Sequence, residues 1–104
     1  MRVGNNLGFS GNYRFLTPNK QTNDEVFNAF AQSTKTNDKE YQVERNSGEI
    51  FLRTPHPQWS SPDFSFIKTA LGVFPERKAQ AYLNSINTVF NANAAPVRLP
   101  EVVA

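Results

Sequence analysis

"EYQVERNSGEIFLRT", residues 40–54, predicts a β-hairpin, because two runs with alternating apolar residues flank a short polar turn. Two registers compete for it. With an odd number of loop residues, Val43 lies opposite Phe51, and both faces of the hairpin mix apolar with polar side chains. With the two-residue turn "SG" (47–48), Val43 pairs with Leu52 and one face becomes apolar throughout. We expect the second register, since a uniform apolar face can be buried against a core.

The favoured register separates the hairpin into two faces of different polarity. The apolar face carries Tyr41, Val43, Ile50 and Leu52, and the polar face carries Gln42, Glu44, Glu49 and Arg53. Phe51 is then left on the polar face beside Arg53. Aromatic and arginine side chains are enriched among the residues that dominate binding interfaces. Both residues are therefore candidates for contact with a partner.

Upstream of the hairpin, the sequence predicts one more strand and a helix. The strand is "NYRFLT" (12–17), which Pro18 ends. The helix covers about 23–35, where Thr22 and Glu25 have the spacing of a capping box that satisfies two free backbone amides. Apolar residues follow at helical spacing: Val26, Phe27, Phe30 and Ala31.

Downstream of the hairpin, two further helices are predicted. The first covers about 62–72, with Ser61 as the N-cap, Pro62 at the first helical position and Asp63 in the first turn. The second covers about 75–92. Its inner face carries apolar residues at the helical period: Ala79, Tyr82, Leu83, Ile86, Val89 and Phe90.

These elements together predict a two-layer α+β domain in which helices pack on one face of a short antiparallel sheet. The sheet has three strands, at about 12–17, 40–45 and 49–54. The chain then divides into an irregular lead-in (1–11), a single globular domain (12–92) and an extended or disordered tail (93–104). The tail has no periodicity and two prolines.

The composition fits one domain and excludes several kinds of site. Eleven Lys and Arg against nine Asp and Glu give a net charge of +2, too small for long-range attraction to nucleic acid or to an anionic membrane. The chain has no cysteine and one histidine, which excludes thiolate zinc sites and thiol nucleophiles. We expect no metal and no cofactor. No apolar run has the length of a signal peptide or a membrane span, so we expect a soluble, cytoplasmic protein.

The connector "RTPHPQWSSPD" (53–63) holds the one histidine and the one tryptophan of the chain. His56 with Ser60, Ser61 and Asp63 suggests a base, a nucleophile and an orienting acid. All these parts lie within eight residues, however, whereas separate rigid elements hold the members of a working triad. Ser61 and Asp63 are also accounted for as helix-start residues. We therefore expect no catalytic residue, and a small hydrolase using His56 is the least favoured alternative.

Trp59 allows two interpretations. An indole between Pro57 and a helix start usually packs back over the edge of the core, and a small domain needs most of its large aromatic residues there. Alternatively, Trp59 is an exposed anchor in a loop stiffened by prolines, and a stiff loop loses little entropy on binding. The first interpretation is favoured, and the second stays open.

We therefore expect a small non-enzymatic binding or regulatory protein that acts by contact with another protein. Its candidate contact residues are Trp59, His56, Phe51 and Arg53. The alternative is binding of single-stranded nucleic acid on the sheet face, where bases stack on aromatic rings and cations meet phosphates. This alternative is weaker because Glu44 and Glu49 share that face and reduce its positive charge.

Overall fold

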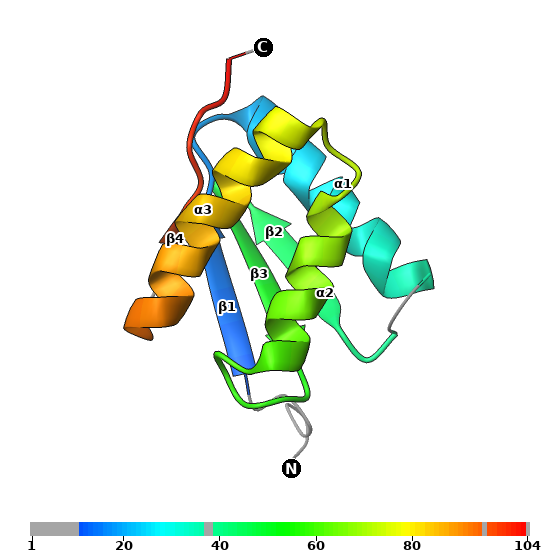
Figure 1. Cartoon of the computed structure of the whole chain (residues 1–104). Coiled ribbons are helices and arrows are strands. Elements are labelled where there is room, and N and C mark those ends of the chain that lie inside the picture. Colours follow the sequence, from blue (N-terminus) through cyan, green and yellow to red (C-terminus); the bar gives the residue numbers. More distant parts are fainter. Residues whose placement is uncertain (1–10, 37–38, 95, 104) are drawn as a thin grey trace.

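Three helices cover one face of a four-stranded sheet in a two-layer α+β arrangement (Figure 1). This computed structural model describes residues 11–36, 39–94 and 96–103. The elements in chain order are β1 (Gly11–Leu16), α1 (Lys20–Thr36), β2 (Gln42–Asn46), β3 (Glu49–Thr54), α2 (Ser61–Leu71), α3 (Glu76–Ala92) and β4 (Val97–Arg98). The α+β class expected from the sequence is confirmed.

The hairpin forms in the register that the apolar pattern favoured. β2 and β3 pair antiparallel, with Val43 opposite Leu52 and Arg45 opposite Ile50. Gly48 lies in the turn with a φ of 87°, in the left-handed region where glycine is unstrained. Burial alternates along β3, and both Ile50 and Leu52 are fully buried. The hairpin therefore turns its apolar face toward the helices.

β1 lies inside the sheet, whose strand order is β2-β3-β1-β4. It pairs antiparallel with β3, with Tyr13 opposite Leu52 and Phe15 opposite Ile50. The two aromatic side chains of β1 are buried, while Arg14 between them is exposed on the outer face. The inner face of the sheet thus continues from the hairpin into β1.

The sheet has a fourth strand that the sequence analysis did not predict. β4 runs parallel to β1, with Val97 opposite Phe15, and the Leu99 amide donates to the Leu16 carbonyl at 2.9 Å. Val97 and Leu99 are buried, while Arg98 between them is exposed. The expectation of a purely antiparallel, three-stranded sheet was therefore incomplete, because a two-residue strand between two prolines is too short to give a periodic signal.

Two helices begin at residues other than those that the capping patterns predicted. α1 begins at Lys20, and Asn19 caps it by accepting the Thr22 amide at 2.8 Å. Thr22 is a buried residue inside the helix, so its predicted role as the N-cap was wrong. α2 begins at Ser61, which makes Ser60 its N-cap residue.

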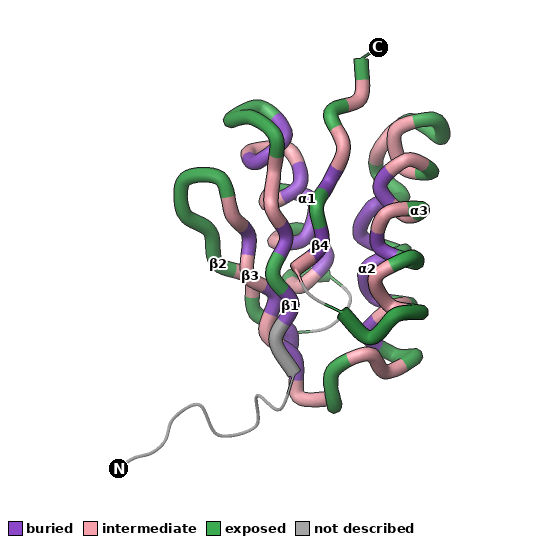
Figure 2. The backbone as a smooth tube through the Cα atoms, turned by 90° about the vertical axis from the view of Figure 1, so that its left-hand side faces the viewer, coloured by how far each residue is buried: buried purple, intermediate pink, exposed green. Residues whose placement is uncertain are grey.

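The core lies between the sheet and the helices, where buried parts of both layers face each other (Figure 2). A chain of aromatic rings runs through it. Phe15 packs on Phe30 of α1 with ring centroids 5.2 Å apart, and Phe30 packs on Phe66 of α2 at 6.5 Å. Phe66 stacks on Tyr41 at 4.1 Å. These contacts fix the start of α2 against one end of the sheet, which positions the loop between β3 and α2.

Candidate functional site

One buried carboxylate holds the loop between β3 and α2 in place. Asp63, in the first turn of α2, is fully buried. Its Oδ2 accepts a hydrogen bond from the Tyr13 hydroxyl at 2.6 Å, and its Oδ1 accepts from the hydroxyls of Tyr41 and Thr54 at 2.7 Å each. Nδ1 of His56 lies 3.1 Å from the same Oδ1. We call these five residues the Asp63 cluster.

The hydroxyl protons of the Asp63 cluster determine whether Nδ1 of His56 donates or accepts a hydrogen bond. Tyr41 and Thr54 each have one hydroxyl proton, and each donates it to Asp63. Their oxygens can therefore only accept from Nδ1 of His56, which lies 3.0 Å from Tyr41 and 3.3 Å from Thr54. Because its neighbours are all acceptors, Nδ1 of His56 carries a proton and donates it within the cluster.

The cluster keeps Asp63 ionised. Burial alone would raise the pKa of Asp63, but the hydrogen bonds of the cluster, led by that of Tyr13, outweigh burial and hold this pKa below its ordinary value. Burial and the hydrogen bond to Asp63 raise the pKa of Tyr13, so Tyr13 remains a donor. A charged acceptor with four donors forms a strong connection between the sheet, the loop and α2.

The contact between His56 and Asp63 corrects one expectation from the sequence. Asp63 is a first-turn acid as predicted, but it also reaches His56, because the first turn of α2 packs against the loop. A carboxylate on Nδ1 is the arrangement that orients a catalytic imidazole. Here, however, Asp63 also serves three hydroxyls, and the hydroxyl of Ser60 is buried while Ser61 lines a different pocket. The two serines next in sequence therefore do not complete a triad with His56.

The buried hydroxyl of Ser60 has no hydrogen-bond partner among the described residues, although Ser60 is the N-cap residue of α2. A buried polar group without a partner costs about 1–3 kcal/mol. We therefore expect Ser60→Ala to leave the free energy of unfolding unchanged or to raise it by about 1 kcal/mol. If the hydroxyl capped the helix, the same substitution would lower the free energy of unfolding by about 1 kcal/mol. Urea unfolding followed by circular dichroism measures the change. A clear loss of stability would show that the hydroxyl is satisfied after all.

Trp59 adopts a backbone conformation that large side chains rarely take. Its φ is 68°, and such a conformation costs about 1–3 kcal/mol and persists only where the surroundings enforce it. The backbone amide of Trp59 donates to the Tyr13 hydroxyl at 2.6 Å. The indole packs edge-on against Tyr13 and Phe90, with ring centroids 5.3 and 4.9 Å away. Trp59 therefore packs over the edge of the core and yet remains partly exposed.

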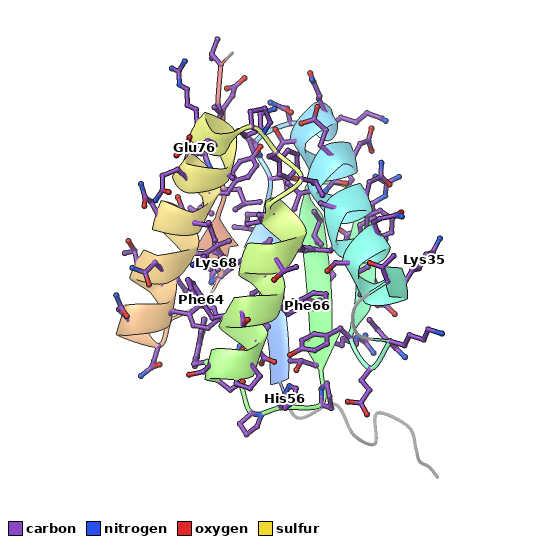
Figure 3. All side chains as sticks on the ribbon, turned by 45° about the vertical axis from the view of Figure 1, so that its right-hand side comes forward. Lys35, His56, Phe64, Phe66, Lys68 and Glu76 are labelled. Atoms are coloured by element: carbon purple, nitrogen blue, oxygen red, sulfur yellow. The ribbon has the colours of Figure 1, made fainter. Side chains whose placement is uncertain are left out.

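A surface pocket between α2 and α3 brings Trp59 together with Phe64 and Phe90. All three rings are half-buried, and Phe64 meets Phe90 edge-on at 5.1 Å. The pocket has a volume of about 440 Å³, and we call it the aromatic pocket. Exposed side chains form its rim: Ser61, Ser65, Lys68, Asn87 and Asn91. Figure 3 shows Phe64 and Lys68 on the side of α2 that faces α3.

Sequence reasoning missed Phe64 and Phe90 as site residues, and helical spacing assigned Phe90 to the inner face of its helix. The signal that could have found them is the run of Ser and Asn residues beside them, at Ser65 and Asn91 for example. Small polar side chains next to a large ring leave part of that ring uncovered. Both rings therefore contact the core and remain accessible at the surface.

The outer face of the sheet places Phe51 between two ion pairs. Phe51 is half-buried, with Arg14 opposite on β1 and Glu44 opposite on β2. Arg14 pairs with Glu49, and Arg53 pairs with Glu44 at 3.2 Å. Both arginines beside the ring are thus already paired with glutamates, which reduces the positive charge that this face offers to nucleic acid.

The four contact residues proposed from the sequence do not share one surface. Phe51 and Arg53 lie on the outer face of the sheet, whereas His56 and Trp59 lie on the loop at the start of α2. Even on this loop the two side chains line separate pockets. Trp59 lines the aromatic pocket, whereas His56 and Phe66 line another pocket on the other side of α2. The aromatic pocket is thus the place where Trp59 gathers further exposed rings.

Comparison with known proteins finds no matching family model, curated protein or solved structure. Among the residues that the structure describes, no three His, Asp or Glu side chains come together where they could hold a metal ion. Within the same part of the chain, no helix combines the length and apolar character needed to cross a membrane.

Proposed function

We propose that this protein is a small binding domain that acts by contact with another protein, and that the aromatic pocket receives an apolar side chain of that partner. The observation that carries the proposal is the gathering of three partly exposed rings, Trp59, Phe64 and Phe90, in one pocket. Aromatic side chains in central pockets contribute most of the affinity in many interfaces. The pocket combines these apolar rings with polar groups at its rim, and ligand sites commonly combine apolar contacts with polar groups that fix the ligand's orientation.

Hydrogen bonds to the Asp63 cluster hold Trp59 in place, and this favours binding. The Tyr13 hydroxyl fixes the backbone of Trp59, and Asp63 in turn fixes that hydroxyl. The indole is therefore already ordered before a partner arrives, which avoids an ordering cost of about 0.5–1.5 kcal/mol for that side chain. In this proposal the Asp63 cluster supports the pocket and performs no chemistry.

Asn87→Arg tests the proposal with Asn84→Arg as its matched control. Asn87 is exposed on α3 at the rim of the aromatic pocket, and an arginine there would obstruct the pocket without weakening the helix, because arginine is a better helix former than asparagine. Asn84 is an exposed residue of the same type on α3 that does not line the pocket. We expect the wild type and Asn84→Arg to retain the same protein from a lysate of the native host, and Asn87→Arg to retain about tenfold less.

The comparison is made by quantitative mass spectrometry of the retained proteins, after thermal melts have shown that both variants remain folded. A partner that all three forms retain equally would bind elsewhere and contradict the proposal. A partner lost equally from both arginine variants would also contradict it, because the effect would then follow from added charge on α3.

A further inference from the structure

We infer that the partner segment bound in the aromatic pocket carries a carboxylate next to its apolar side chain, and that Lys68 pairs with this carboxylate. The inference rests on the proposed function, because it describes the ligand of the same pocket. The feature that supports it is the charge of the rim. Of the described residues that line the pocket, Lys68 alone is charged, and the others are aromatic or uncharged polar residues.

Lys68 lies where it can reach a ligand seated on the rings. It follows Phe64 by one helical turn, so the two side chains lie on the same face of α2. Lys68 is exposed, and the ion pairs found among the described residues do not include it. By contrast, Lys20 and Lys78 are each paired with an acid. The Lys68 ammonium group is thus open to a charge from outside the chain.

The uncharged groups of the rim suit the same ligand. Ser61 and Ser65 on α2 carry hydroxyls, and Asn87 and Asn91 on α3 carry amides, all of which can donate hydrogen bonds to carboxylate oxygens. A basic ligand would find acceptors on this rim but would face the charge of Lys68. The rim is therefore complementary to an acidic segment.

A lysine in the last turn of a helix also has a purely structural explanation, since it stabilises the negative end of the helix dipole. Lys68 occupies this place in α2, and Lys35 occupies the equivalent place in α1. Both are exposed, but Lys35 lies on another helix, away from the aromatic pocket (Figure 3). Lys35→Glu therefore controls for the dipole effect of Lys68→Glu.

The test uses the single tryptophan of the chain as a reporter of the pocket. The indole N–H of Trp59 gives one separate NMR signal in the full-length, ¹⁵N-labelled protein. The probes are three capped pentapeptides with the same central leucine, flanked on both sides by aspartate, asparagine or lysine. We expect the aspartate peptide to shift the indole signal with an affinity about threefold higher than the asparagine peptide and to exceed the lysine peptide by more, with the differences shrinking in high salt.

Lys68→Glu should reverse the order of the three peptides, and Lys35→Glu should leave it unchanged. If the three peptides shift the indole signal with equal affinity, the inference about Lys68 is wrong while the pocket remains a binding site. If no peptide shifts the signal at any concentration, the proposed function fails at this pocket. A signal of the free protein that moves with protein concentration would show that a second copy of the chain occupies the pocket, which would overturn the acidic ligand.

Discussion

Asp63→Asn will lower the free energy of unfolding by about 3–5 kcal/mol at pH 7, a large part of the stability of a domain this small. The hydroxyls of Tyr13, Tyr41 and Thr54 all donate to the carboxylate, as does the ring of His56. An amide replaces one acceptor oxygen with a donor, so at least one of these four groups would lose its partner inside the protein. Urea unfolding at pH 7, followed by circular dichroism and by Trp59 fluorescence, measures the loss.

The effect of Asp63→Asn will also depend on pH. The pKa of Asp63 in the folded protein lies below its ordinary value of 3.8, so on acidification the unfolded chain takes up the proton first. The stabilisation is therefore complete well above pH 3.8 and is lost as the pH falls through the folded pKa. We expect the difference in free energy of unfolding between wild type and Asp63→Asn to shrink as the pH falls from about 5 to about 2.

Asp24→Asn is the control for this pH dependence. The pKa of Asp24 is also lowered, by hydrogen bonds from Lys20 and Arg45, but these partners lie at the surface. Removing the Asp24 carboxylate should change the free energy of unfolding little at any pH in that range. A constant difference between wild type and Asp63→Asn across the acid range would contradict the assignment of Asp63 as an ionised group.

Tyr13→Phe will destabilise the protein more than Tyr41→Phe, although each change removes one hydroxyl from the same carboxylate. The Tyr13 hydroxyl donates to Oδ2 of Asp63 and accepts from the Trp59 amide, so its loss affects two buried groups. The Tyr41 hydroxyl donates to Oδ1, which keeps Thr54 as a donor. We expect a loss of about 2–4 kcal/mol for Tyr13→Phe and about 1–2 kcal/mol for Tyr41→Phe.

The two tyrosine variants should also differ in the aromatic pocket. Without the Tyr13 hydroxyl, the strained backbone of Trp59 loses its hydrogen bond, so the fluorescence maximum of Trp59 should shift toward that of an exposed indole. Tyr41→Phe leaves this bond intact and should keep the wild-type spectrum. Equal stability losses with identical spectra would mean that Tyr13 does not brace the pocket.

The hairpin register was predictable because a shift by one residue would have mixed polar and apolar side chains on both faces. Val43 and Leu52 face each other for that reason, and the same pattern extended to Tyr13 and Phe15. The capping of α1 was not predictable from spacing alone. Asn19 and Thr22 are both acceptable N-cap residues, and the burial of Thr22 against the core decides between them.

The Asp63 cluster was missed because its five members come from five separate elements or loops. A signal was nevertheless present in the predicted register, which places Tyr41 beyond the pair of Gln42 with Arg53 and therefore near Thr54. Tyr13 also faces inward toward this end of the sheet. Three inward hydroxyls at one end of an otherwise apolar face require a buried acceptor. What the sequence could not supply was the path of the loop that brings Asp63 to them.

The pairing of β4 with β1 implies an order of events during folding. β1 gains its neighbour β3 from the hairpin, but its other edge stays open until β4 arrives from far along the chain. Contacts between distant segments form slowly because a long loop must close first. Until β4 is synthesised, the edge of β1 that includes Phe15 therefore has no strand beside it. Such an unpaired edge can pair with another chain. The short strand at Val97 thus covers that edge at Phe15 and Leu16, where the two strands pair.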